Sequence, residues 1–388
     1  MKRACCCLLG ISLLASCGSK QPQIDRTHEE GVEVVLNHLK PYRIPNEPSE
    51  LVLEKEFVID AESPGLLEAG LTDIYQFGAD SRGFVYLTQR ARKDGFVVFQ
   101  FDGRGHFLKS FGRVGQGPGE IEWSSYFGIS SRDDIFVLDT RRKKILTFAP
   151  SGELIRETLL PRLLTGGIPL ENGTFFASES RDLSASGLAE ISFNLFDRQF
   201  AKIKTLYRFQ FPLQFERTEK VNVFYPNPTG TFTSDRIFIG MPGREYEVLV
   251  YDLAGILLRK IRKEYAPVAV TAGFKKEVLA KVPKENSIAE RLYFPDKKPA
   301  FQYFFADEAG RLFVMTMEKD DGSGQNVCDI FNASGVFIAR AAVGYYDILR
   351  TIWEGLSLEV VARNGRIYTL HEKEDGYKEL VVYKAIWR

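Results

Sequence analysis

One arrangement of strands and turns recurs six times between residues 77 and 387, and this repeat limits the possible folds more than any other feature. In each copy a polar turn precedes a short aromatic or β-branched run, a second apolar alternation follows, and a glycine turn leads into a third. Val97–Phe101 illustrates the alternation, and Asp102-Gly103 supplies the tight turn after it. The copies cover residues 77–112, 127–159, 170–207, 233–263, 303–343 and 360–387.

A single copy has two apolar faces and cannot bury both of them alone. Packing the copies around a central axis buries both faces and leaves only short edges exposed. The abundance of Phe (30 residues) and Tyr (16 residues) also favours strands over helices. The sequence therefore predicts an all-β fold, a six-bladed β-propeller.

The two ends of the repeat region predict how the ring closes. The sixth copy stops after Ile386-Trp387 without a final strand, whereas residues 51–59 form a strand-like run that belongs to no copy. We expect this run to complete the last blade, so that the propeller occupies residues 51–388.

One segment interrupts the β pattern between the fourth and fifth copies. Phe274, Val278 and Val282 are spaced by four residues, a helical stripe, and Pro283 ends it. We expect a short helical insertion over about residues 271–293. It either covers an open rim of the ring or forms one wall of a binding site.

The first residues read as a targeting signal. Lys2-Arg3 precede an apolar run that is too short to span a membrane and that ends in Leu14-Ala15-Ser16-Cys17. This order resembles the lipobox of bacterial lipoproteins, which implies a signal peptide over 1–16 and lipidation of Cys17; a plain secretory signal is the alternative. Residues 17–50 would form a tether with a short helix. Cys328 is then the one remaining thiol, and we expect it to be a buried apolar residue.

The glycine-rich stretch Ser110–Ile121, SFGRVGQGPGEI, raises the question of a phosphate-binding loop. Gly115 and Gly117 begin a GxGxxG pattern, but Glu120 replaces the third glycine and no helical stripe follows. We interpret the stretch as the joint where the chain crosses from the outer strand of one blade to the inner strand of the next.

The same stretch carries a family resemblance. FGRVGQGPGEI followed by IFVLDTRRKKILTFAPSGELI resembles a repeat of NHL-type propellers. Together with LASC and GVEVVLNHLKPYR, the six copies resemble the bacterial six-bladed β-propeller lipoproteins over about residues 30–388. The resemblance implies the fold and a binding or scaffolding role in the cell envelope, on either the outer-membrane or the periplasmic or extracellular face; it names no ligand.

No arrangement of residues predicts catalysis. The four histidines are scattered and form neither HExxH nor HxH. We therefore predict no catalytic residue, no metal ligand set and no cofactor. The equal numbers of basic and acidic residues, 51 of each, argue against a nucleic-acid partner. The acidic run 318–326 reads as a hairpin tip, with a calcium loop as the alternative.

Two groups of side chains in the second copy are candidate ligand-binding residues. Trp123 and Tyr126 begin the copy near the expected axis, where they either pack in the core or form a stacking platform for a sugar or peptide. Arg141 and Arg142 either belong to a solvated hairpin or form an anion-binding rim.

These observations predict a cell-envelope lipoprotein, held at the membrane by its N-terminal lipid, whose propeller binds a protein or polysaccharide partner without catalysis. The alternative is a divalent-metal-dependent hydrolase or lyase with its site on the propeller axis.

Overall fold

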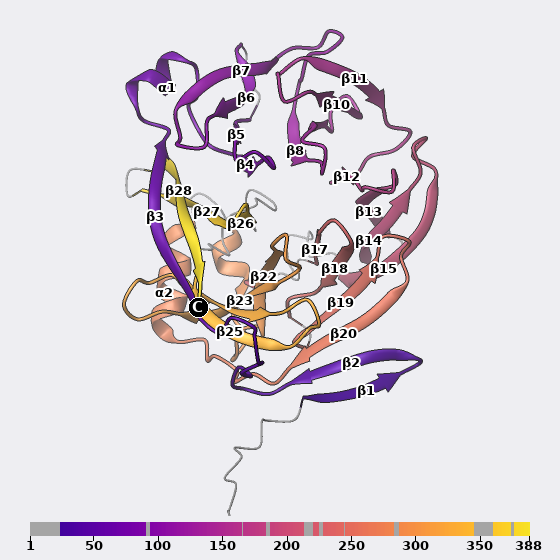
Figure 1. Ribbon diagram of the computed structural model, residues 1–388, viewed down its shortest axis with the longest axis vertical. Coiled ribbons are helices and arrows are strands. Elements are labelled where there is room, and N and C mark those ends of the chain that lie inside the picture. Colours follow the sequence, from indigo (N-terminus) through magenta and orange to yellow (C-terminus); the bar gives the residue numbers. More distant parts are fainter. Residues whose placement is uncertain are drawn as a thin grey trace, which may run out of the picture.

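The computed structural model describes residues 24–90, 94–164, 166–183, 187–212, 220–224, 228–243, 245–282, 287–344, 360–373 and 376–388. These residues form six antiparallel sheets arranged as blades around a central axis (Figure 1). The predicted six-bladed, all-β propeller is therefore confirmed. The predicted signal segment 1–16 and Cys17 lie outside the described residues.

Each blade runs from an inner strand at the axis to an outer strand at the rim (Figure 1). Blade 1 consists of β4 (Gln76–Ala79), β5 (Val85–Thr88), β6 (Phe96–Phe101) and β7 (Phe107–Arg113). Blade 2 consists of β8 (Ser124–Ile129), β9 (Ile135–Asp139), β10 (Lys144–Phe148) and β11 (Leu154–Leu159). Blade 3 consists of β12 (Ile168–Pro169), β13 (Phe175–Leu183), β14 (Leu188–Phe196) and β15 (Lys202–Pro212).

The second half of the ring follows the same order. Blade 4 contains β17 (Thr229–Phe232), β18 (Arg236–Gly240), β19 (Glu247–Asp252) and β20 (Leu257–Lys263). Blade 5 contains β22 (Phe301–Ala306), β23 (Leu312–Lys319), β24 (Asn326–Phe331) and β25 (Phe337–Ala342). Blade 6 contains β26 (Val360–Arg363), β27 (Arg366–Glu372), β28 (Lys378–Trp387) and, as its outer strand, β3 (Leu51–Asp60).

The core lies between neighbouring blades. The middle strands are buried on both faces, as β9 and β10 show, whereas the outer strand β11 is largely exposed. Separate apolar clusters join each blade to the next; Phe127 and Phe148 of blade 2, for example, pack with Val98 and Phe111 of blade 1. Burying both faces of each sheet is what requires the ring. Cys328 is fully buried in the cluster around blade 5, as predicted.

The last blade is completed by a strand from the beginning of the described chain. β3 pairs antiparallel with β28, from Glu379 opposite Asp60 to Trp387 opposite Leu51. Ile59, only 2% exposed, packs in the cluster between blades 6 and 1. The predicted closing strand at 51–59 is thus observed, one residue longer than expected.

The short helix expected within residues 17–50 is not found among the described residues 24–50, and this prediction was wrong. Instead, β1 (Asp25–Glu29) and β2 (Val32–Asn37) form a hairpin, and β2 pairs in parallel with the outer strand β20 of blade 4. The turn residues Glu30 and Gly31 both have positive φ, which fits a two-residue hairpin turn. β-branched valines in β2 favour a strand, and Val34 and Val35 are buried.

The helical insertion between blades 4 and 5 is confirmed. It contains α2 (Ala272–Lys281), capped where the Thr271 hydroxyl accepts a hydrogen bond from the amide of Phe274, and a 3₁₀ helix (Ser287–Arg291). Val278 is buried against Met317 of β23 in a small apolar cluster. β16 (Val221–Asn222) and β21 (Leu292–Tyr293) form a two-stranded parallel sheet. A further short helix, α1 (Pro64–Glu68), precedes blade 1. No helix in the described ranges is both long and apolar enough to cross a membrane.

The glycine-rich stretch is the joint between blades 1 and 2, as interpreted. The amide of Gly117 donates to the Glu120 carboxylate at 2.9 Å, and the amide of Gly119 donates to Glu157 of β11 at 2.7 Å. Gly119 has a φ of 73°, and a Cβ on Gly115 would meet the Glu120 carboxylate at 2.0 Å. Gly119 therefore uses the backbone freedom of glycine, whereas a side chain at position 115 would require the Glu120 carboxylate to move.

Removing the closing strand's buried contact should weaken the whole ring. We expect Ile59→Ala to lower the free energy of unfolding by about 2 to 4 kcal/mol, because it leaves a cavity between the first and last blades. Glu54→Ala, at an exposed position of the same strand, should change it by less than about 0.5 kcal/mol. Urea denaturation of both variants tests this. A loss for Ile59→Ala as small as that for Glu54→Ala would show that closure through β3 contributes little.

Blade 6 also contains a titratable group with a strongly lowered pKa. Burial, reinforced by the positive charge of Lys55, lowers the pKa of His371 in β27 to about 4. The imidazole contacts the Thr369 hydroxyl at 2.8 Å, and the Glu379 carboxylate lies 3.9 Å away. The folded chain therefore keeps this histidine neutral under mildly acidic conditions.

Acidification should thus cost stability through this residue. Between pH values of about 6.5 and 4 the unfolded state binds the His371 proton and the folded state does not, so stability falls as the pH falls through this window. We expect the wild type to lose about 2 kcal/mol more than His371→Gln between about pH 7 and about pH 5. Urea denaturation at both pH values measures the difference, and parallel losses in the two proteins would contradict it.

Candidate functional site

The inner strands of five blades end at a cavity on the propeller axis, which we call the axial cavity. Its volume is about 250 Å³. Apolar residues at the ends of β8, β12, β17, β22 and β26 form part of the wall, and the polar part comes mainly from the turns that follow these strands. The lining residues are Ile129, Ser131, Pro169, Leu170, Glu171, Phe232, Thr233, Ser234, Ala306, Asp307, Glu308, Ala362 and Arg363.

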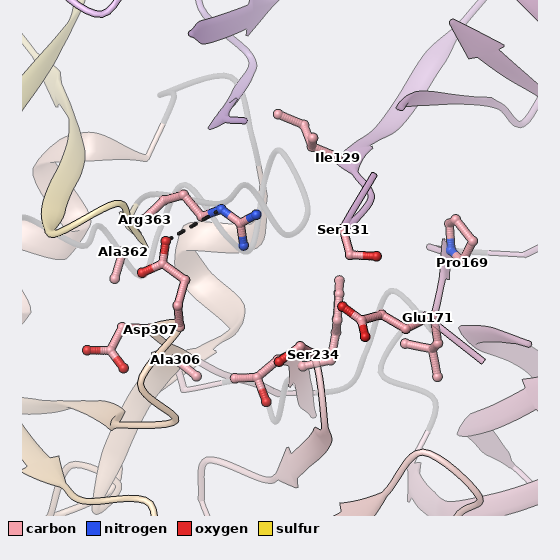
Figure 2. Close-up of a pocket in the computed structure, with 13 residues that line it drawn as sticks. Ile129, Ser131, Pro169, Glu171, Ser234, Ala306, Asp307, Ala362 and Arg363 are labelled. Carbon is pink, nitrogen blue, oxygen red and sulfur yellow. Dashed lines mark ion pairs between the residues drawn. The ribbon is translucent and has the colours of Figure 1, made fainter. Parts of the chain in front are cut away.

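Arg363 supplies the positive charge of the axial cavity. Figure 2 shows its guanidinium group extending from the end of β26 into the space between the blades. Its Nε lies 3.6 Å from the Glu308 carboxylate, and within the described chain this buried nitrogen has no hydrogen-bond partner. The side chain is 31% exposed, so the rest of its donors remain accessible to a ligand.

Acceptors and hydroxyl groups lie across the cavity from Arg363. Glu171 and Ser131 point inward from blades 3 and 2 (Figure 2). Among the described residues the Glu171 carboxylate forms neither a hydrogen bond nor an ion pair, and Glu171, Ser131 and Ser234 are all exposed. The cavity therefore brings hydrogen-bond donors, acceptors and hydroxyl groups together around one space.

Hydrogen bonds between neighbouring turns hold part of this rim in place. The side-chain amide of Asn364 in blade 6 donates to the Asp80 carbonyl of blade 1 at 2.6 Å. Ser81 in blade 1 donates from its amide (2.8 Å) and its hydroxyl (2.7 Å) to Asp133 of blade 2. The amide of Asn364 also donates to Glu308 of blade 5. The turns of blades 5, 6, 1 and 2 are thus joined in sequence around the axis.

One carboxylate in the cavity wall serves the scaffold. Burial raises the pKa of Asp307, and the nearby Arg311 opposes this shift. Asp307 accepts a hydrogen bond from the amide of Arg311 at 2.8 Å and pairs with its guanidinium at 3.0 Å. In Figure 2 its carboxylate turns away from the centre of the cavity, which fits a role in shaping the turn after β22.

The structure brings three of the four predicted binding residues together, but away from the axial cavity. The Arg141 guanidinium lies 4.6 Å from the centre of the Trp123 ring. Glu122 pairs with Arg142 at 2.7 Å and with Arg141 at 3.8 Å. This cluster lies beside the beginning of β8, whereas Ile129 at the other end of the strand lines the cavity. Ligand binding here stays a prediction; the ion pairs to Glu122 already neutralise much of its positive charge.

Tyr126 does not join that cluster. It packs on the blade 3 side of β8 with Phe136 and Leu160, and a Cβ on Gly166 would lie 3.6 Å from its ring. Burial raises the pKa of its hydroxyl well above the usual range. These contacts fit the core-packing alternative rather than the stacking platform.

The sequence did not single out the axial residues Glu171, Glu308 and Arg363. Each belongs to a different copy of the repeat, and each follows an apolar run that ends an inner strand: PLE, FFADE and VVAR. An alignment of the six copies at this position would have shown that polar residues follow the inner strands. The separate motifs do not show this, because no two of these three residues belong to the same motif.

Over the described ranges no three His, Cys, Asp or Glu side chains come together in the way that a metal site needs. The four histidines, His28, His38, His106 and His371, all lie in described segments, and none lines the axial cavity. The metal-dependent alternative gains no support from these residues. The predicted hairpin tip at 318–326 is observed, with Asp320 accepting hydrogen bonds from the amide and hydroxyl of Ser323.

Comparison with known proteins gives one family match. A family model, DUF5128, which is described as a 6-bladed beta-propeller, matches residues 78–227, less than half of the chain. The description agrees with the architecture above. No curated protein matches the chain.

Several solved structures are similar at low identity. A DUF4221 family member from Bacteroides vulgatus is 12% identical with a TM-score of 0.48, and the match covers 88% of this chain and 99% of that one. Virginiamycin B lyase from Staphylococcus aureus is 11% identical with a TM-score of 0.38, covering 85% and 88%. BamB from Moraxella catarrhalis is 12% identical with a TM-score of 0.34, covering 86% and 100%. At these values nothing about the activities of those proteins is carried over to this chain.

A pair of substitutions should separate scaffold from site. The buried Asp139 carboxylate accepts hydrogen bonds from the amides of Glu122 (2.7 Å) and Arg142 (3.1 Å). We expect Asp139→Ala to lower the free energy of unfolding by about 2 to 4 kcal/mol, since two donors lose a charged acceptor. Arg363→Met should cost less than about 1 kcal/mol, because it removes one long ion pair at a partly exposed position.

Urea denaturation of the two variants beside the wild type measures these effects. A cost for Arg363→Met as large as that for Asp139→Ala would mean that Arg363 is held for the stability of the ring rather than for a ligand.

Proposed function

We propose that this chain is a lipid-anchored protein of the bacterial cell envelope whose propeller binds a partner, a protein or an extracellular polymer, at the axial cavity and without catalysis. The observation that carries the proposal is the convergence of Arg363, Glu171 and the hydroxyl residues on one cavity whose rim is braced between blades. A concave site with a few placed polar groups among apolar ones is the usual form of a binding site.

The rim braces support recognition by a rigid site. Asn364 and Ser81 fix the turns of blades 6, 1 and 2 relative to one another, and Glu308 connects blade 5 to the same network. Polar groups held in place before binding lose little conformational freedom when a partner arrives, which improves affinity and selectivity. Neither Ser131 nor Ser234 is hydrogen-bonded to a base among the described residues, so the same groups fit binding better than nucleophilic attack.

The proposed anchor fits the path of the chain. The described chain begins at Ile24 and enters the hairpin at the outer edge of blade 4 (Figure 1). The seven residue steps from Cys17 to Ile24 span at most about 25 Å when fully extended. Lipid on Cys17 would thus keep the outer edge of blade 4 close to the membrane and leave the axis free for a partner.

Cross-linking in intact cells tests the binding role. The full-length wild type should yield a specific cross-linked partner, and Arg363→Met should reduce its yield about tenfold or more because a central charged contact is lost. Arg156→Met is the matched control, at an exposed position on β11 outside the cavity, and should behave as the wild type does. An equal yield from all three proteins, or no partner from any, would count against the proposal.

The same cells test the anchor. Labelling with a fatty-acid analogue followed by membrane fractionation should show the protein in the membrane fraction for the wild type and for Cys7→Ser. Cys17→Ser should abolish both the label and the membrane association. Retention of the label by Cys17→Ser would exclude lipidation at this residue.

A further inference from the structure

The wall of the axial cavity alternates between apolar and polar side chains, and this pattern bears on the kind of ligand. Blade 2 contributes Ile129 and then Ser131, and blade 3 contributes Pro169 and then Glu171. Blade 6 contributes Arg363 directly after an alanine. In each of these blades an apolar residue at or near the end of the inner strand precedes the polar residue, and in blade 6 that polar residue, Arg363, is itself the last residue of β26.

We propose that the axial cavity binds one uncharged sugar ring, such as the terminal residue of an extracellular glycan; this inference rests on the binding role proposed above. A sugar ring presents C–H patches beside hydroxyl groups, and each hydroxyl both donates and accepts. Arg363 offers donors only, Glu171 accepts only, and Ser131 and Ser234 do both. Each of these four side chains can therefore form a hydrogen bond with a sugar hydroxyl.

The charges of the wall disfavour an anionic ligand. An anionic group near Arg363 would also approach Glu308, whose carboxylate lies 3.6 Å from the Nε of Arg363. A cationic group near Glu171 would meet the guanidinium across the same small space (Figure 2). The cavity is lined by the carboxylates of Glu171, Asp307 and Glu308 and by the single guanidinium of Arg363. An anion is therefore repelled more than it is attracted, whereas hydroxyl groups can bond to both Arg363 and Glu171.

The size of the cavity matches a small group such as a single ring. Its volume of about 250 Å³ corresponds to roughly eight water molecules at the liquid volume of about 30 Å³ each, and it lies below the range of about 300 to 1,000 Å³ typical of drug-sized ligands. One six-membered ring with its hydroxyl groups would occupy this space, and further rings of a glycan would lie outside it.

The test uses the full-length chain and a panel of methyl glycosides: neutral hexosides, a hexuronide and an aminohexoside, with a serine- and threonine-rich peptide as the non-sugar probe. Ligand-observed NMR followed by titration calorimetry should show binding of at least one neutral hexoside. Its dissociation constant should rise about tenfold or more in Glu171→Gln and in Arg363→Met, because each removes a charged hydrogen-bonding partner.

Matched controls lie outside the cavity, on blade 2. Glu153→Gln and Arg156→Met change the same chemistry at exposed positions and should bind the hexoside as the wild type does. Binding of only the hexuronide, the aminohexoside or the peptide would overturn the neutral-sugar assignment, as would affinities that Glu171→Gln and Arg363→Met leave unchanged.

The two proposals fail separately. If no glycoside binds while the cellular cross-link still depends on Arg363, the ligand class is wrong and the binding role stands. If the cross-link is also independent of Arg363, both the ligand class and the axial binding role are wrong.

Discussion

The fold depends on one constraint: each blade is a sheet with two apolar faces, and only another blade can cover each face. β9 and β10 are buried along their whole lengths, and similar middle strands occur in neighbouring blades. A row of such sheets would leave an uncovered face at each end, and joining the ends removes both. The converging inner strands then bring their following turns together at the axis. The candidate site is thus a geometric consequence of the packing that closes the ring.

Closure is reinforced by the segment that precedes blade 1, which contacts three consecutive blades. The hairpin β1–β2 extends blade 4, β3 completes blade 6, and the chain between them crosses blade 5. Asn37 is fully buried there; its amide donates to the carbonyl of Gly335 at 3.0 Å and its carbonyl accepts from the amide of Phe337 at 2.8 Å. The amide of Tyr42 donates to the carbonyl of Phe337 at 2.8 Å. A force applied at the N-terminus would therefore act first on these contacts at the outside of the ring and not on the contacts around the axis.

The features that could be predicted from the sequence are those that depend on local patterns of residues. The strand pattern within each copy, the strand at 51–59 and the stripe from Phe274 to Val282 each lie within one short stretch, and each is observed. The N-terminal hairpin was missed because Glu30-Gly31 is a less obvious turn signal than Asn-Gly, and because its partner β20 lies far away in the chain. Trp123 and Arg141 were identified in one copy as members of two separate groups, and the structure brings them together. Arg363 and Glu171 were not, since only the closed ring brings their copies together.

Within each copy, different residues form the core and the cavity wall, and this explains how a propeller can change its ligand without losing its fold. The apolar ends of the inner strands contribute to the core, while the residues just after them face the axial cavity and contribute little to the packing between blades. Asp307 is one exception, since it pairs with Arg311 in the turn after β22. Glu308 is another, because it accepts a hydrogen bond from the amide of Asn364 in the rim and also pairs with Arg363 in the cavity. A substitution at Glu308 would disturb the rim and the charge balance together. Arg363 and Glu171 have no such double role in the described structure, so a ligand preference can be altered there while the blades remain packed as they are.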